Sequence, residues 1–286
     1  MERQEFHDEK ETRLQTLTVG GEKMKRKKFT WSIMVICLAM IATLCCSAVD
    51  QTVYNWYCVR NKEHRQPVAD AKMRWIEQFH GYYVDHAHGD DSEEKVIYLT
   101  FDAGYENGNI EKILDILKTE DVCGAFFILE NLIVRNPELV RRMKTDGHII
   151  GNHTAHHKDM TTVKTVEEFK QELDALNQLY RETFGEELSN YYRPPEGKFD
   201  ERSLHFADQL GYQTIFWSMA YADWDNTHQP TAEFAKAKLL DHVHNGAIVL
   251  LHPTSATNVQ ILGEVIQTLK ADGYRFGTLD ELTGQG

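Results

Sequence analysis

Two residues that could do acid–base chemistry each end an apolar run of the sequence. Asp102 ends the run in Thr100-Phe-Asp, and a carboxylate at the end of a strand is well placed to act as a general base. His252 ends the run Ile248-Val-Leu-Leu-His, where a nearby carboxylate such as Asp223 would raise the pKa of its imidazole. An aspartate that stabilises a turn, or a histidine satisfied inside the core, would produce the same patterns.

A pair of histidines has the spacing of metal ligands. His153 and His157 lie four residues apart in Gly151-Asn-His-Thr-Ala-His-His, a spacing that puts both imidazoles on one face of a helical turn. Such a pair also arises by chance, and His156 is a possible substitute for His157 at a spacing of three. The pattern favours His153 and His157 as ligands of one metal ion.

Arg193 stands immediately before two prolines in the sequence Arg-Pro-Pro-Glu-Gly. Because each proline fixes its own backbone torsion φ, the segment that follows the arginine is rigid. A rigidly held guanidinium suits bidentate binding of a carboxylate. A surface arginine before a rigid turn is the alternative interpretation.

The elements that must position these residues are short apolar runs that alternate with helical patterns from Lys95 onward. Such alternation indicates parallel strands joined by helical crossovers. About seven repeats in roughly 190 residues favour a short (β/α) barrel, with a doubly wound open sheet as the second choice. Neither glycine fingerprint of a phosphate-binding loop occurs, which weakens a nucleotide-binding fold. The expected strands are Val96–Phe101, Ala125–Leu129, His148–Gly151, Tyr191–Arg193, Thr214–Trp217, Ala247–Leu251 and Tyr274–Phe276.

The candidate residues share one position relative to these expected strands. Each falls at or just beyond the C-terminal end of a strand, and in a (β/α) barrel those ends converge on the face that holds the active site. A general base, two metal-type histidines, an orienting arginine and an aspartate–histidine acid pair together indicate metal-assisted hydrolysis. The residues are Asp102, His153, His157, Arg193, Asp223 and His252.

Charge is unevenly distributed along the 286 residues, whose net charge is −13. Residues 1–28 carry eight basic and six acidic side chains, whereas residues 50–286 carry 23 basic and 38 acidic ones, a net charge of −15. Phosphate groups repel so acidic a domain, and we therefore exclude nucleic acid as a partner.

One segment has the composition of a membrane span. Phe29–Val49 runs for 21 residues without a charge, which matches the ~20 residues that cross the hydrocarbon core of a bilayer. The basic cluster that begins at Lys25 precedes it and should stay in the cytoplasm. The small residues Ser47-Ala end the segment and could serve a signal peptidase, so a single-pass anchor in the cell membrane and a secreted form are both possible.

The chain is thus expected to have four parts. They are a cytoplasmic basic leader (1–28), a transmembrane anchor or signal segment (29–49), a juxtamembrane segment with a linker (50–93) and a catalytic domain (94–283).

Cysteine usage indicates no disulfide framework. Three of the five cysteines lie in the apolar segment, and Cys58 and Cys123 remain outside it. Cys123 belongs to an apolar run typical of a buried strand, so a free thiol is favoured over a disulfide with Cys58.

Five motifs, taken in order, resemble those of the NodB-type polysaccharide deacetylases of carbohydrate esterase family 4. The resemblance covers roughly residues 95–283 and implies a deformed (β/α) barrel with a divalent metal, often zinc. By the resemblance, Asp102 would be the base and Arg193 would orient it. His252 would be the acid, tuned by Asp223. The motifs are Thr-Phe-Asp (100–102), His-Thr-Ala-His-His (153–157), Arg-Pro-Pro-Glu-Gly (193–197), Asp-Trp (223–224) and Leu-Leu-His (250–252).

The resemblance implies that His153 and His157 hold the metal, but one expected ligand is missing. Most members carry a second aspartate where this chain has Ala103, so the metal should bind more weakly. Glu106 is close in sequence and is a possible substitute ligand. Ala220 is a further departure, because many members have the first aspartate of the fourth motif there.

A narrower resemblance points to the substrate. Thr-Phe-Asp-Ala-Gly-Tyr-Glu-Asn-Gly (100–108), with Trp56-Tyr and Gln66-Pro upstream, is similar to the delta-lactam-biosynthetic de-N-acetylases of spore-forming bacteria, which often lack the second aspartate. That subgroup acts on N-acetylmuramic acid in spore-cortex peptidoglycan, which implies glycan strands as the partner. The alternatives are a deacetylase of N-acetylglucosamine in peptidoglycan or chitin-like polymers, and a non-catalytic glycan-binding protein.

Four further residues are expected to meet such a substrate. Trp217 and Trp224 could stack on sugar rings, although core packing explains them equally well. A backbone amide near Pro195-Glu196 could stabilise the oxyanion of the attacked acetamide. The charge of Glu196 would sit awkwardly beside the carboxylate of muramic acid.

Overall fold

The strands predicted from the apolar runs are all present in the computed structural model, which describes residues Thr52–Gln285. The predicted leader (1–28) and membrane segment (29–49) lie outside the described residues. Within the described part of the chain, no helix combines the length and apolar character needed to cross a membrane.

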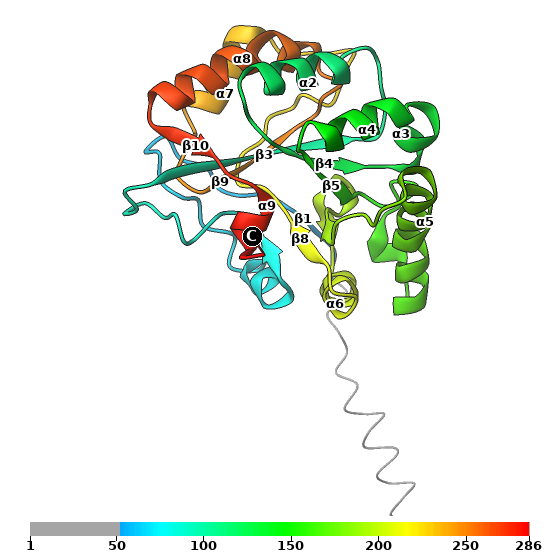
Figure 1. Ribbon diagram of the computed structural model, residues 1–286. Coiled ribbons are helices and arrows are strands. Elements are labelled where there is room, and N and C mark those ends of the chain that lie inside the picture. Colours follow the sequence, from blue (N-terminus) through cyan, green and yellow to red (C-terminus); the bar gives the residue numbers. More distant parts are fainter. Residues whose placement is uncertain (1–51, 286) are drawn as a thin grey trace, which may run out of the picture. The chain divides into compact units, whose positions relative to one another are not determined.

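The elements follow one another in the order that the sequence predicts, with several short additions (Figure 1). The strands are β1 (Tyr54–Asn55), β2 (Gly81–Tyr82), β3 (Lys95–Ala103), β4 (Ala125–Ile128), β5 (Ile149–Asn152), β6 (Tyr191–Tyr192), β7 (Lys198–Phe199), β8 (Gln213–Ile215), β9 (Ala247–Leu251) and β10 (Tyr274–Phe276). The helices are η1 (Arg74–Phe79), α2 (Ile110–Thr119), α3 (Glu130–Arg135), α4 (Pro137–Thr145), η2 (Met160–Thr162), α5 (Val166–Phe184), η3 (Pro195–Gly197), α6 (Glu201–Gln209), α7 (Ala232–Leu240), α8 (Ala256–Ala271) and α9 (Leu279–Thr283).

The main sheet is parallel throughout and curls back on itself. Its strand order is β10-β3-β4-β5-β6-β8-β2, and β9 pairs with β3 outside that path. Met219 lies just beyond β8 and forms a parallel bridge with Val249 of β9. This bridge brings the β8 side of the sheet against β9. The sheet is therefore a curled, barrel-like α/β arrangement, consistent with the predicted deformed barrel.

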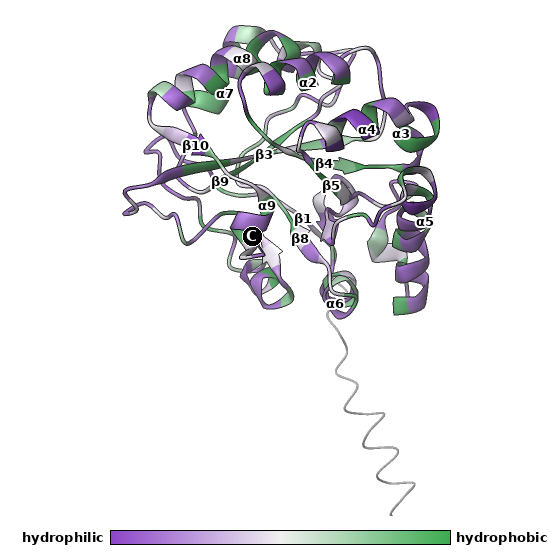
Figure 2. Ribbon diagram, viewed as in Figure 1, coloured by the Kyte–Doolittle hydropathy of each residue, from purple (hydrophilic) through white to green (hydrophobic). Residues whose placement is uncertain are grey.

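β9 is apolar on both faces, and β3 is largely so apart from Thr100 and Asp102 towards its C-terminal end, because both faces of these strands are covered. All five residues of β9 are buried, and Figure 2 shows the green colour of hydrophobic residues along β3 and β4. Figure 1 shows α2, α7 and α8 packed together outside β3 and β9. The polar residues near the C-terminal ends of the strands are therefore exceptions to an otherwise apolar sheet.

Side-chain caps fix where two of the predicted helices begin. The Thr165 side chain accepts a hydrogen bond from Glu168 N at 3.2 Å, and α5 starts immediately after it. Asp200 and Ser203 form a reciprocal capping box at the start of α6. These caps satisfy backbone N–H groups in the first turn of each helix, so both helices begin at defined residues.

Residues 54–84 pack into the same compact unit as the residues of the predicted catalytic domain. β1 pairs with β7, and β2 extends the main sheet beside β8. Trp56 and Ile76 are buried in one apolar cluster with Phe199. The strands of this segment are only two residues long, so they leave no periodic pattern in the sequence.

Cys58 and Cys123 are both free, as expected from the sequence. Burial raises the pKa of the Cys58 thiol to about 12. Its sulfur therefore stays protonated and unreactive near neutral pH.

Candidate active site

Asp102 lies near the C-terminal end of β3, and its carboxylate meets two of the predicted partners. Oδ1 accepts a hydrogen bond from Arg193 Nη1 at 2.9 Å, and Oδ2 lies 3.5 Å from His153 Nε2. Burial alone would raise the pKa of Asp102, but the positive charges around it lower the pKa. Burial also lowers the pKa of His153 to about 4, so that imidazole is neutral near pH 7. Arg193 is therefore the permanent cation that keeps Asp102 ionised.

The guanidinium of Arg193 is fully buried and is fixed by the barrel wall as well as by Asp102. Nη2 donates to Thr100 Oγ1 at 2.8 Å, and Nε donates to Ile215 O at 2.9 Å. The ring of Phe127 lies 4.2 Å from the guanidinium carbon. Asp102 thus receives a single hydrogen bond, which corrects the expected bidentate contact, because Thr100 takes the second nitrogen.

His153 and His157 come together, and His156 turns away from them. The ring centroids of His153 and His157 are 5.0 Å apart. His153 Nδ1 lies 2.9 Å from Arg193 O and must donate to that carbonyl, which leaves a lone pair on Nε2. His156 Nδ1 instead lies 3.1 Å from the carboxylate of Glu172. The structure therefore favours His153 and His157 over any pair that includes His156.

The histidine pair is held by an irregular loop and not by the helical turn that its spacing suggested. Thr154 and His157 both have positive φ, at 71° and 56°. This region is strained for a β-branched residue such as threonine. Asn152 Oδ1 accepts a hydrogen bond from Thr154 N at 2.8 Å and helps to hold the loop in this form.

At the position where the resemblance implies a third metal ligand, this chain has no donor atom. Ala103 is buried at the end of β3 and offers no ligand atom. The carboxylate of Glu106 accepts hydrogen bonds from the backbone N–H groups of Gly108 and Ile110, so it caps the start of α2. Among the described residues, no group of three or more His, Cys, Asp or Glu side chains is arranged to hold a metal ion. Of the metal ligands that the resemblance implies, the described part of the chain brings together the imidazoles of His153 and His157.

Asp223 and His252 form the second polar pair of the site. His252 Nδ1 lies 2.7 Å from Asp223 Oδ1, and the backbone N–H of His252 donates to Oδ2 at 2.7 Å. Burial lowers the pKa of His252, but the hydrogen bond and charge of Asp223 outweigh that effect and raise it. Because Nδ1 is engaged, Nε2 is the nitrogen left to exchange a proton with a ligand.

The two tryptophans predicted to meet the substrate have different environments. Trp224 is 61% exposed, and its ring centroid lies 6.3 Å from that of His252. Trp217 is half-buried, lies 5.7 Å from the guanidinium carbon of Arg193 and accepts a hydrogen bond on its carbonyl from Trp56 Nε1 at 2.7 Å. Trp224 is placed to touch a ligand, whereas Trp217 supports Arg193.

The turn after Arg193 presents one of its two predicted residues to solvent. Pro195 is buried, whereas Glu196 is exposed and has a φ of 59°. Gly197 N donates to Pro194 O at 3.0 Å and closes the turn. The amide and side chain of Glu196 therefore stay candidates for contact with a ligand.

Two polar residues of the site escaped the sequence reasoning. Thr100 lies inside the motif Thr-Phe-Asp, which was a signal that could have found it. Asn258 donates to Asp223 Oδ2 at 2.6 Å from the first turn of α8, where nothing in its local pattern distinguishes it from a helix residue.

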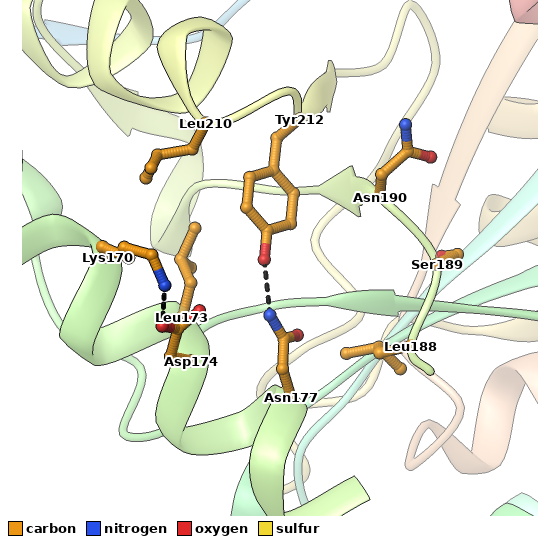
Figure 3. Close-up of a pocket in the computed structure, with 9 residues that line it drawn as sticks. All are labelled: Lys170, Leu173, Asp174, Asn177, Leu188, Ser189, Asn190, Leu210 and Tyr212. Atoms are coloured by element: carbon orange, nitrogen blue, oxygen red, sulfur yellow. Dashed lines mark hydrogen bonds and ion pairs between the residues drawn. The ribbon is translucent and has the colours of Figure 1, made fainter. Parts of the chain in front are cut away.

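A separate hollow lies at the opposite end of the strands and shares no residue with this site. It has a volume of about 260 Å³ and lies beside α5 (Figure 3). Ser189 and Asn190 line it just before β6, whereas Arg193 follows β6. Within it Asn177 Nδ2 donates to Tyr212 Oη at 2.7 Å. This hollow is therefore not part of the site formed by Asp102, Arg193 and His252.

The fold and the paired acid–base groups at the strand ends define an α/β-barrel hydrolase, and comparisons give its family. A model of the polysaccharide deacetylase family matches residues 89–215. The peptidoglycan-N-acetylmuramic acid deacetylase PdaA of Bacillus subtilis is 38% identical over 256 residues, which cover 88% of this chain and 95% of that protein. The solved structure of PdaA, a family 4 carbohydrate esterase, has a TM-score of 0.77 and 39% identity, covering 83% of this chain and 99% of that one. The chain belongs to the polysaccharide deacetylase family, carbohydrate esterase family 4.

Other relatives differ in substrate and in activity. The peptidoglycan-N-acetylglucosamine deacetylase PgdA of Listeria monocytogenes is 33% identical over 195 residues, which cover 67% of this chain and 39% of that protein. The Bacillus anthracis protein BA3943, a pseudoenzyme of the same family, has a TM-score of 0.63 and 27% identity over 71% of this chain and 68% of that one. Family membership therefore gives the reaction class, deacetylation of a polysaccharide, and leaves the sugar to be argued.

Proposed function

We propose that this chain removes N-acetyl groups from the amino sugars of peptidoglycan, and that N-acetylmuramic acid is its preferred sugar. The arrangement of Asp102 against Arg193 and of His252 against Asp223 carries the proposal. The likeness to PdaA along 95% of that protein supports the choice of sugar. The freed amine would then be available for ring closure onto the lactyl carboxyl, as in formation of the muramic delta-lactam of the spore cortex.

The proposed roles follow from the protonation states of the two pairs. Asp102 is ionised and removes a proton from the attacking water, whose oxygen bonds to the acetamide carbon. A backbone amide near Glu196 donates to the developing oxyanion. Protonated His252 donates from Nε2 to the sugar nitrogen as the carbon–nitrogen bond breaks. Acetate and a free amino sugar are the products.

His153 and His157 would hold a divalent metal, and their surroundings fit one. Nδ1 of His153 donates to a backbone carbonyl, the usual way in which a ligating histidine is oriented. Two imidazoles suit zinc, but with Ala103 in the third position the affinity should be low. When bound, the metal would polarise the acetamide carbonyl and make the attacking water more acidic.

Restoring the missing carboxylate should strengthen metal binding. We expect Ala103→Asp to lower the zinc Kd at least tenfold, because a third, charged ligand joins the two imidazoles. His153→Ala should raise the Kd about a hundredfold. Calorimetric titration of metal-free protein with zinc measures both without reference to activity. His156→Ala is the matched control, and an effect of that variant as large as the effect of His153→Ala would contradict the assignment.

Product analysis tests the reaction and the sugar together. Purified residues 50–286 would be incubated with muropeptides and with N-acetylglucosamine oligomers, with and without zinc, and acetate and amino sugars would be quantified. Release of acetate from N-acetylmuramic acid is the expected result. Release of acetate from N-acetylglucosamine alone would show that N-acetylmuramic acid is not the preferred sugar, and it would still support the proposed deacetylation reaction. No acetate from either substrate under metal-replete conditions would favour a non-catalytic glycan-binding protein.

Deacetylation of N-acetylglucosamine is the second candidate, and Glu196 favours it. Its exposed carboxylate lies in the turn beside the site, where it would repel the lactyl carboxylate that distinguishes muramic acid. Relatives that act on N-acetylglucosamine are known within the family.

The proposal includes the location of the enzyme. The charge-free segment Phe29–Val49 behind a basic cluster supports a membrane anchor with the catalytic part outside the cytoplasm. Retention in the membrane fraction after an alkaline wash would agree with the anchor. A mature chain that begins near residue 50 would show instead that the segment is a cleaved signal.

A further inference from the structure

Asn258 lies in the first turn of α8, and its side chain joins the two members of the Asp223–His252 pair. The residue is 1% exposed. Its Nδ2 donates to Asp223 Oδ2 at 2.6 Å and to the backbone carbonyl of His252 at 3.0 Å. Both hydrogens of the amide are therefore donated, one to the Asp223 carboxylate and one to the His252 carbonyl.

Tyr221 fixes which way this amide points. Its hydroxyl donates to Asn258 Oδ1, and burial raises the pKa of Tyr221, so the hydroxyl keeps its proton. With Oδ1 facing a donor on one side, Nδ2 must face the carboxylate of Asp223 on the other. A flipped amide would lose the bonds to Asp223 and to the His252 carbonyl, and it would turn the Tyr221 hydroxyl from a donor into an acceptor.

The loops around Asn258 are tied together by two further side chains. Ser255 Oγ accepts a hydrogen bond from Asn258 N at 3.1 Å and donates to Gln229 Oε1. Gln229 Nε2 in turn donates to Asp223 O at 2.9 Å. The backbone of Asp223 is thus held independently, so Asn258 acts on the orientation of its carboxylate.

The two oxygens of Asp223 are divided between different donors. Oδ2 accepts from Asn258 and from the backbone of His252, and this leaves Oδ1 for His252 Nδ1 at 2.7 Å. Without the amide, Oδ2 of the fully buried carboxylate keeps one donor, and the carboxylate gains freedom to rotate. We propose that Asn258, oriented by Tyr221, is a positioning residue that keeps Asp223 Oδ1 directed at His252.

This inference rests on the proposed function, in which His252 is the acid. Loss of the directed contact removes the bond that raises the pKa of His252, while Asp102 and Arg193 still face the imidazole with opposite effects on that pKa. The alkaline limb of the pH profile should then move to lower pH, because His252 loses its proton sooner.

Asn258→Leu tests the proposal, since leucine keeps the volume and removes the amide. We expect kcat for acetate release to fall about tenfold with KM changed by less than twofold, because the contact matters after substrate has bound. Thr257→Val is the matched control. Thr257 Oγ1 donates to Pro230 O at 2.7 Å in the same turn, and it is also buried. The control should lose stability and keep both kcat and the pH profile.

A substrate-free measurement separates this inference from the proposed function. The imidazole resonances of His252 can be titrated by NMR in the intact domain, and Asn258→Leu should titrate at lower pH than the wild type. An inactive wild-type protein would refute the proposed function and leave this readout intact. If Asn258→Leu does not fold, Tyr221→Phe should lower kcat about threefold in the same manner. An unchanged kcat and an unchanged His252 titration in a folded variant would overturn the proposal.

Discussion

Replacing Asp102 with asparagine should lower kcat for acetate release about a thousandfold, the middle of the range of ~10²–10⁴ for a general base. Asparagine keeps the shape of the side chain and can still accept the hydrogen bond from Arg193 Nη1. It cannot take up a proton from water. The change should therefore leave KM within about twofold, and steady-state kinetics on N-acetylated muropeptides with added zinc measures it.

Asp225→Asn is the matched control for this variant. Asp225 is exposed and bonds to Thr227 and His228, away from Asp102, so the same chemical change should leave kcat unaltered. Full acetate release by Asp102→Asn with zinc present would show that another group is the base.

The pH dependence of the wild type follows from Asp102 and His252 together. The pKa of Asp102 is lowered, so the base is lost only when the pH falls below the ordinary aspartate value of about 3.9. The pKa of His252 is raised, so the acid persists above the ordinary histidine value of about 6.5. A bell with a broad plateau between these two limits is the expected profile of kcat.

Replacing His252 with alanine should lower kcat on amide substrates about a hundredfold to a thousandfold, because the departing amine would have to leave without a proton. The alkaline limb of the pH profile should disappear, since the group that titrates there is gone. An aryl acetate ester offers a sharp comparison, because its leaving group needs no proton. The variant should hydrolyse such an ester with a loss of less than about tenfold.

His228→Ala serves as the control here, because His228 is exposed and bonds to Asp225 and Thr227. Equal losses on the amide and the ester in His252→Ala would indicate that the residue supports the fold of the site and is not the acid.

The predicted strands came from local patterns, and the structure places them where those patterns suggest. Asp102, Arg193 and His252 each stand at or just beyond the C-terminal end of a strand, as an apolar run followed by a polar residue predicts. Burial on both faces requires largely apolar strands, so a polar residue that follows an apolar run lies near the end of a strand. This relation is local, and the sequence alone therefore located the strand ends to within about two residues.

Two features of the site could not be derived from local sequence patterns. Arg193 meets Asp102 across 91 positions of the chain and uses one nitrogen, because Thr100 and the carbonyl of Ile215 claim the others. The choice of His157 over His156 rests on a loop with two left-handed residues, which no spacing rule describes. Packing of these groups against one another decided each case.

The acid–base residue types and their order along the chain were determined by the sequence by itself. The burial of Trp56 against Phe199 and the amide of Asn258 on Asp223 were decided only by the tertiary structure. The physical reason is that a strand or helix signals itself by periodic burial, whereas a single long-range hydrogen bond or a two-residue strand has no period. Such contacts exist only once the chain is folded, and they orient the groups whose types the sequence supplies.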